Sequence, residues 1–156
     1  MTFLGLPLHF IVLHAAVVFT PLTAAVAVVF AAVPPWRYLT RWPTAVLTVI
    51  MLASVWLARI SGHSFLKSRP DLVKLVETHG HRGDQLSLVA ILFTVVVAAA
   101  IWGLGGPSGL SSGRGAVPMR TAALDRGLAA VVVLVSLLLL VWVFLTGDAG
   151  ARAVWG

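Results

Sequence analysis

The sequence predicts an all-α integral membrane protein, a four-helix bundle that crosses the bilayer, and two observations lead to this fold class. First, 60% of the 156 residues are hydrophobic, only 10% are charged, and the mean hydropathy is +1.02. Soluble globular domains are roughly half apolar and about a quarter charged. Second, the apolar residues gather into four segments near the length of about 20 residues that a transmembrane helix needs. These observations exclude a soluble domain.

Proline and glycine residues mark the ends of the four predicted spans. Pro34 and Pro35 end the first span, because proline cannot continue a helix. Pro43 is expected in the first turn of the second helix, and the stretch "GGPSG" ends the third. The chain then forms a single domain over residues 1–156. The predicted spans are residues 8–33, 43–60, 85–104 and 124–145.

Pro21 lies inside the first predicted span and predicts a kink there. Proline has no backbone N–H, so the carbonyl of Val17, four residues earlier, loses its helical partner. The hydroxyl of Thr20 is expected to help satisfy that carbonyl.

The connection between the second and third spans is predicted to contain a short amphipathic surface helix. In "PDLVKLVETH", the side chains of Leu72, Leu75, Val76 and His79 follow the i, i+3, i+4, i+7 spacing of one helix face. Pro70 is suited to its start. Such a helix is expected to lie on the bilayer surface or across the end of the bundle, with His79 on its apolar side.

All five histidines are predicted to gather at one membrane face. An even number of crossings places both termini and the connection between the second and third spans on the same side of the bilayer. Every histidine of the sequence lies beside one of these three places. We therefore expect a histidine cluster there. The histidines are His9, His14, His63, His79 and His81.

His14 and His79 are the best-placed pair for a cofactor. His14 lies about 9 Å inside the first span, counted from Leu8 at 1.5 Å per residue. An ionisable residue at such a depth indicates either a functional site or a hydrogen bond to another helix. His9 and His14 point about 140° apart on a helix, so they do not form a chelating pair. A second ligand must come from elsewhere, and His79 is on the same side.

Acidic residues at the span ends extend the set of possible metal ligands. Asp84 is expected to cap the third helix, and Asp148 is expected to pair with Arg152 four residues later. Imidazole and carboxylate together suit zinc, copper or iron, while the absence of cysteine excludes thiolate ligands and covalently attached haem. The predicted ligands of a transition-metal or proton-handling site are His9, His14, His79, Asp84 and Asp148.

The basic residues are expected to set the membrane topology and contact anionic lipid rather than bind a nucleic acid. Lys and Arg number 11 against 5 Asp and Glu, which gives a net charge of +6 without any basic run interleaved with aromatic residues. The first span has no basic residue before it and Arg37 and Arg41 after it. Because the first helix usually sets orientation, both termini are expected on the extracytoplasmic side. The lipid bilayer is the expected partner, and no nucleic acid is.

Three stretches of the sequence resemble a known family. They are "GLPLHFIVLHAAVVFTPL", "VETHGHRGD" and the closing "TGDAGARAVWG". Together they resemble the bacterial four-span membrane proteins catalogued as domain of unknown function 2231, above all the actinobacterial branch. The resemblance implies a multi-pass protein of the bacterial inner (cytoplasmic) membrane with no established activity. Some members stand beside or are fused to Rieske-type modules, which implies a redox partner. The matching positions are His9, His14, His79, Gly83, Asp84, Gly147, Asp148, Gly150 and Trp155.

Three functions follow as hypotheses. The first is a non-enzymatic accessory or structural subunit whose histidines bond within the bundle. The second is a b-type haem electron-transfer protein with His14 and His79 as axial ligands, because helix bundles hold haem between facing histidines. The third is a transition-metal or proton-handling site at the mouth of the bundle. Because the sequence contains no HExxH, P-loop, GxGxxG or nucleophile-elbow motif, an enzyme is the less favoured class.

Overall fold

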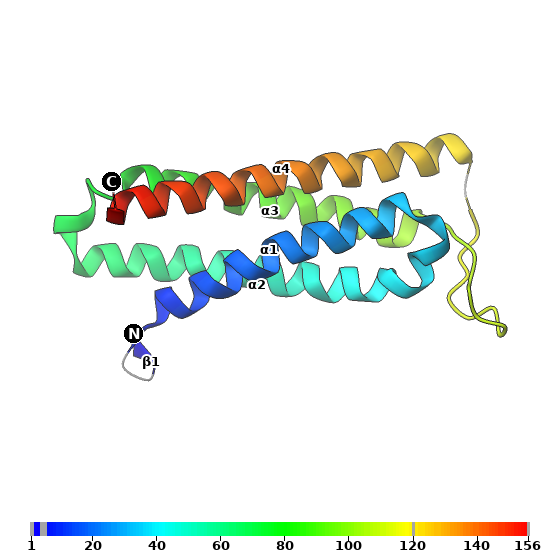
Figure 1. Ribbon diagram of the computed structural model, residues 1–156, viewed down its shortest axis with the longest axis horizontal. Coiled ribbons are helices and arrows are strands. Elements are labelled where there is room, and N and C mark those ends of the chain that lie inside the picture. The colour runs from blue at the N-terminus through cyan, green and yellow to red at the C-terminus, as the bar shows by residue number, and fades with distance from the viewer. Residues whose placement is uncertain (1, 4–5, 120, 156) are drawn as a thin grey trace.

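Four long helices dominate the computed structural model, which describes residues 2–3, 6–119 and 121–155, and the side chains of residues 12–119 and 121–155. They run side by side along one axis, each antiparallel to the next (Figure 1). All four are long and apolar enough to cross a membrane, so the predicted all-α membrane bundle is confirmed. The helices are α1 (Leu8–Ala32), α2 (Arg37–Ser68), α3 (Glu77–Gly103) and α4 (Ala122–Trp155).

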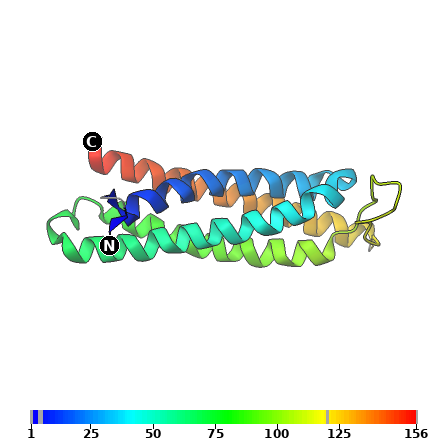
Figure 2. The ribbon, with the colours of Figure 1, turned by 90° about the horizontal axis from the view of Figure 1, so that it is seen from below.

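The helices form a ring in which each packs against two others. α1 packs against α2, α2 against α3, α3 against α4, and α4 closes the ring against α1. α1 and α3 therefore lie diagonally across the bundle. The start of α1, the α2–α3 connection and the end of α4 share one end of the molecule (Figures 1 and 2). We call it the histidine end, and the opposite end, with the α1–α2 and α3–α4 connections, the arginine end.

Short elements join or precede the helices. Before α1, β1 (Thr2–Phe3) pairs antiparallel with β2 (Leu6–Pro7). A turn of 3-10 helix, η1 (Pro34–Trp36), connects α1 to α2, and a second, η2 (Pro70–Leu72), follows α2. In the α3–α4 connection the backbones of Gly106 and Val117 form an isolated antiparallel bridge.

Three of the helices are longer than the predicted spans. α2 starts at Arg37 and ends at Ser68, and α4 continues to Trp155. At 1.5 Å per residue, 32 residues of α2 measure roughly 48 Å, whereas the hydrocarbon core is about 30 Å thick. An apolar segment marks only the part of a helix that lies in lipid, and the backbone hydrogen bonds continue into the polar flanks. Pro43 consequently lies inside α2, so its expected place in the first turn was wrong.

The predicted amphipathic surface helix is not present as a separate element. Residues 70–72 form the 3-10 turn η2, residues 73–76 are turns and a bend, and α3 begins at Glu77. The hydrogen bond from the N–H of Gly80 to the carbonyl of Val76 belongs to the start of α3. The apolar spacing correctly indicated a helix only in its last part. The residues from Glu77 onward form the first turns of the long helix α3 and not a separate helix. His79 therefore lies in the first turn of α3.

Small residues and hydroxyl groups allow the helices to approach closely. Ala24, Ala27 and Ala90 are fully buried, in keeping with the small residues found where membrane helices pack. Buried hydroxyls return to carbonyls of their own helix: the hydroxyl of Thr20 donates to the carbonyl of Ala16 at 2.6 Å. The expectation that Thr20 would serve the Val17 carbonyl was therefore wrong.

The outer surface of the bundle is apolar along most of its length. Large aliphatic side chains on all four helices are exposed, which would be costly in water over such an area and indicates embedding in a lipid bilayer. They include Val18, Leu22, Val46, Val49, Leu57, Leu88, Val95, Leu134, Leu137 and Val141.

Candidate functional site

His79 is held between α3 and α4 by a hydrogen bond of defined direction. Its Nδ1 lies 2.9 Å from the carbonyl oxygen of Thr146. A carbonyl oxygen only accepts, so Nδ1 carries the proton and donates. In the neutral ring, Nε2 is then left as the unprotonated nitrogen. The hydroxyl of Thr146 donates to the carbonyl of Trp142 at 2.7 Å and lies 3.3 Å from the backbone carbonyl of Arg82. Thr146 on α4 therefore contacts α3 through both its carbonyl and its hydroxyl.

A glycine makes room for the imidazole ring. A Cβ at Gly150 would lie 2.9 Å from Nδ1 and 3.1 Å from Cε1 of His79. Any larger residue must move the ring or separate the helices. Gly147, one turn earlier on α4, has open space where a Cβ would lie.

Arg82 and Asp148 add a second α3–α4 contact beside His79. Arg82 donates to the carbonyl of Leu145 at 2.8 Å and lies 4.0 Å from the carboxylate of Asp148. Arg152 lies 3.0 Å from the same carboxylate, so the predicted i, i+4 pair is confirmed. Asp148 is therefore engaged by two guanidinium groups.

Asp84 lies inside α3 and links it to α2, so its predicted role as a helix cap was wrong. Its carboxylate accepts a 2.6 Å hydrogen bond from Nε of Arg59 and lies 3.5 Å from Nε2 of His63. The guanidinium of Arg59 also stacks 5.1 Å from the ring of Trp56. Because α3 starts earlier than predicted, the helix end that Asp84 was expected to cap does not exist at this position.

An exposed ion pair lies in the connection between α2 and α3. Arg69 and Asp71 are 3.0 Å apart, and both side chains are more than half exposed. The hydrogen bond from Arg69 lowers the pKa of the Asp71 carboxyl below its usual value and raises the pKa of Arg69. Since both groups are in solvent, the pair contributes little to stability.

The remaining histidines do not join His79 in one site. His14 is exposed on α1, which lies diagonally opposite α3, and His81 is exposed on α3. The side chain of His9 lies outside the described residues. Within residues 12–119 and 121–155, no three His, Asp or Glu side chains lie close enough to hold a metal ion. The histidines thus share one end of the bundle without forming a single described cluster.

A shallow pocket of about 480 Å³ opens beside His81 at the histidine end. It lies between α3 and α4, and its walls carry both charges and an aromatic ring. The lining residues are Glu77, Thr78, His81, Arg82, Gln85, Trp142 and Leu145.

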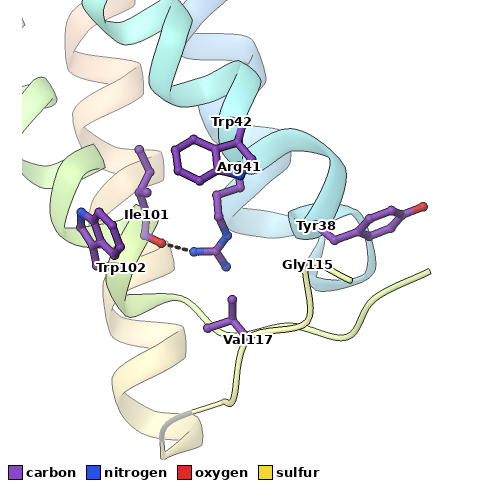
Figure 3. A pocket seen from close by; sticks show the side chains of 7 residues that line it. All are labelled: Tyr38, Arg41, Trp42, Ile101, Trp102, Gly115 and Val117. Atoms are coloured by element: carbon purple, nitrogen blue, oxygen red, sulfur yellow. Dashed lines mark hydrogen bonds between the residues drawn. The ribbon is translucent and has the colours of Figure 1, made fainter. Parts of the chain in front are cut away.

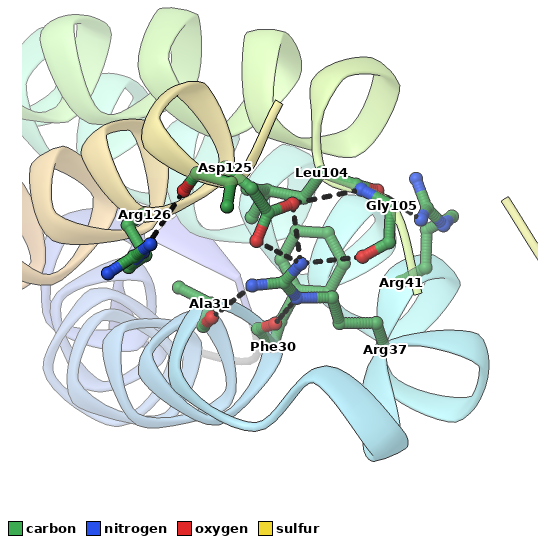
Figure 4. A network of polar contacts seen from close by, with 9 residues as sticks. Phe30, Ala31, Arg37, Arg41, Leu104, Gly105, Asp125 and Arg126 are labelled. Carbon is green, nitrogen blue, oxygen red and sulfur yellow. Dashed lines mark hydrogen bonds and ion pairs between the residues drawn. The ribbon is translucent and has the colours of Figure 1, made fainter. Parts of the chain in front are cut away.

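The most deeply buried charged side chain among the described residues is at the arginine end. Arg37 is 1% exposed, and its Nη1 donates to both oxygens of Asp125 at 2.9 and 2.8 Å and to the carbonyl of Gly105 at 2.6 Å (Figure 4). Its Nε and Nη2 donate to the carbonyls of Phe30 at 3.1 Å and Ala31 at 2.7 Å. One side chain of α2 thus contacts α1, α4 and the end of α3.

Arg41, one turn later on α2, donates hydrogen bonds to carbonyls at the end of α3. It donates to the carbonyls of Ile101 and Leu104, and its guanidinium carbon lies 5.5 Å from the centre of the Phe30 ring. Arg41 is 8% exposed, and its Nε is buried without a hydrogen-bond partner. We call Arg37, Arg41 and Asp125 the arginine clamp.

The arginine clamp satisfies helix termini. The last carbonyls of a helix lack backbone partners and form the negative end of its dipole. Arg37 donates to such carbonyls of α1, and Arg41 donates to those of α3. Asp125 lies in the first turn of α4, at the positive end of that helix. Every charge of the clamp therefore faces a dipole of the opposite sign.

Sequence reasoning missed the arginine clamp because it interpreted these charges as topology signals. A signal was present: two arginines stand four residues apart directly after Pro34-Pro35, and Asp125 is the single acidic residue on a side otherwise basic. An isolated carboxylate among arginines at span ends suits an ion pair across the bundle.

Comparisons with known proteins assign no family to the chain. No protein-family model matches it, and no match was found among the curated proteins or the solved structures. The resemblance to the domain of unknown function 2231 family therefore stays a prediction, and the interpretation of the site depends on its geometry.

Asp125→Asn is expected to destabilise the bundle strongly. The change keeps the shape of the side chain but leaves the Arg37 guanidinium buried without its counter-charge, which costs about 3–5 kcal/mol. Unfolding of the full chain in mixed micelles, followed by helical circular dichroism, measures the loss. Asp71→Asn breaks an ion pair that is exposed and should leave the curve unchanged; similar curves for both variants would contradict a stabilising role for the clamp.

Gly150→Ala is expected to destabilise the chain, whereas Gly147→Ala, on the same helix, is expected to stabilise it. Alanine favours a helix over glycine by about 1 kcal/mol, and Gly147 has room for the added methyl group. At Gly150 the methyl group displaces His79 and breaks its bond to Thr146. The same unfolding assay compares the two, and nitrogen NMR of His79 reports the tautomer. An equal gain for both would show that His79 does not need this space.

Proposed function

We propose that the chain is a small multi-pass membrane protein that serves as a non-enzymatic accessory or structural subunit of a larger membrane assembly. The observation that carries the proposal is how the polar side chains are used. Five polar side chains each bond to a helix, or to the end of a helix, other than the one that carries them. They are Arg37, Arg41, His79, Arg82 and Asp84. Polar side chains that bond helices to one another are typical of a structural protein. An apolar outer surface suits contact with lipid and with other membrane helices.

The proposed address is the inner membrane of a bacterial cell, with the histidine end outside. The support is the resemblance to the four-span bacterial family and the placement of Arg37 and Arg41 directly after the first span. The Rieske-type neighbours of that family suggest a redox protein as the partner in the assembly.

A haem or metal ligand at His79 is the second candidate, favoured by the fixed tautomer of its ring. Histidines that bind metals usually donate their second ring N–H to a carbonyl or carboxylate, and Nδ1 of His79 does so to Thr146. The predicted haem also requires His14, and a metal site also requires His9, Asp84 or Asp148. His14 lies exposed on the diagonal helix, and both carboxylates already bind arginine. This geometry makes the accessory role the better supported one.

Purification of the full chain from its own membranes in mild detergent tests the two candidates together. For an accessory subunit we expect a particle larger than one 16.5 kDa chain in its micelle, with a second protein in fixed ratio and no Soret band after reduction. A single chain that carries stoichiometric haem or transition metal would overturn the proposal.

His79→Ala and His81→Ala form a matched pair for that experiment. The two side chains lie two residues apart, but only His79 bonds across the helix interface. If the chain holds haem, loss of the Soret band on His79→Ala alone assigns the ligand. In an accessory subunit, His79→Ala should weaken the assembly or its stability without any spectral change.

A further inference from the structure

A pocket of about 240 Å³ opens beside the arginine clamp. Figure 3 shows the guanidinium of Arg41 between Trp42 and Val117, with Ile101 and Trp102 on one side. The walls come from the start of α2, the end of α3 and the α3–α4 connection, and they are mostly apolar. The lining residues are Tyr38, Arg41, Trp42, Ile101, Trp102, Gly115 and Val117.

The buried charges around this pocket do not balance. Arg37 and Arg41 are buried, while Asp125 is the one buried carboxylate among the residues whose burial is described. Asp125 pairs with Arg37. Arg41 has only carbonyls and the Phe30 ring, and its Nε has no acceptor. A buried guanidinium without a counter-ion is costly, so the pocket that Arg41 lines suits an anion.

The position of the pocket selects the kind of anion. Trp42 and Trp102 line it and are 64% and 77% exposed. Exposed tryptophans at the ends of membrane helices lie at the level of the lipid headgroups. At that depth, the phosphate of a membrane lipid is held next to the protein by its acyl chains. Exposed aliphatic residues that lie deeper in the bundle, such as Val46 on α2 and Val95 on α3, offer those chains an apolar surface.

We propose that this pocket binds the phosphate group of an anionic glycerophospholipid, with Arg41 as the charged contact. Arginine suits phosphate because its fork of N–H groups donates to two oxygens at once. A lipid with a net negative charge offsets the excess charge of the clamp, whereas a zwitterionic lipid brings its own cation. The inference is independent of the proposed function, because it concerns the opposite end of the bundle from His79.

Native mass spectrometry of the delipidated full chain tests the proposal. The protein is titrated with phosphatidylglycerol and with phosphatidylcholine of the same acyl chains. Because charge-assisted hydrogen bonds are the strong ones, we expect the first bound phosphatidylglycerol to have a Kd lower by about tenfold or more. Equal affinity for the two lipids would overturn the proposal. Competition by millimolar inorganic phosphate would also overturn it, because it would show a site for a free anion.

Val117→Trp and Met119→Trp locate the site without touching a charge. Val117 lines the pocket, and its larger replacement fills it while the backbone bridge to Gly106 can stay. Met119 is exposed nearby and does not line the pocket. The preference for phosphatidylglycerol should disappear in Val117→Trp and persist in Met119→Trp.

A second variant keeps the test open if Val117→Trp does not fold. Trp102→Ala removes an exposed wall of the pocket and no hydrogen bond that the described structure contains. It should reduce the preference several-fold, while unfolding curves show that the bundle is intact. An unchanged preference in folded Val117→Trp or Trp102→Ala would place the lipid elsewhere.

Discussion

The ion pair between Arg37 and Asp125 is the contact on which the arrangement of this bundle depends. Lipid is as apolar as leucine, so transmembrane helices gain little from burying apolar side chains against one another. Close packing of small residues and polar contacts must decide which helices meet. Arg37 on α2 contacts the end of α1, Gly105 shortly after the end of α3, and the first turn of α4. A single guanidinium on α2 thus bonds to α1, to α4 and to the backbone just after α3.

The two ends of the bundle use charge differently. At the arginine end the charged atoms of the arginine clamp are buried and cap helix termini, so breaking one of these contacts leaves an uncompensated charge. At the histidine end the pairs Arg59–Asp84 and Arg152–Asp148 are partly exposed, and such pairs contribute little each. His79 and Gly150 add a contact that depends on shape rather than on charge. The contacts between helices are therefore weaker, one by one, at the histidine end than at the arginine end.

The sequence predicted what the bilayer imposes and missed what packing decides. Four helices and a shared end for the histidines follow from hydropathy, because every backbone group in lipid must be satisfied within its own helix. The pair Asp148–Arg152 was predictable because it lies within one helix turn. Helix lengths were underestimated since polar flanks carry no hydropathy signal. The contacts of His79 and Arg37 depend on how each helix is rotated about its own axis. Packing between helices sets this rotation, and hydropathy along a single sequence does not predict it.

The same two arginines connect the orientation of the chain to its fold. Basic residues after a first span are normally left in solvent or among lipid headgroups, where they retain the chain on the cytoplasmic side. In the folded bundle Arg37 and Arg41 are buried, and their partners beyond α1 are carbonyls at the end of α3 and the carboxylate of Asp125 on α4. In the orientation proposed above, the phosphate of a cytoplasmic-leaflet lipid at Arg41 would offset the positive charge that remains after Asp125 pairs with Arg37.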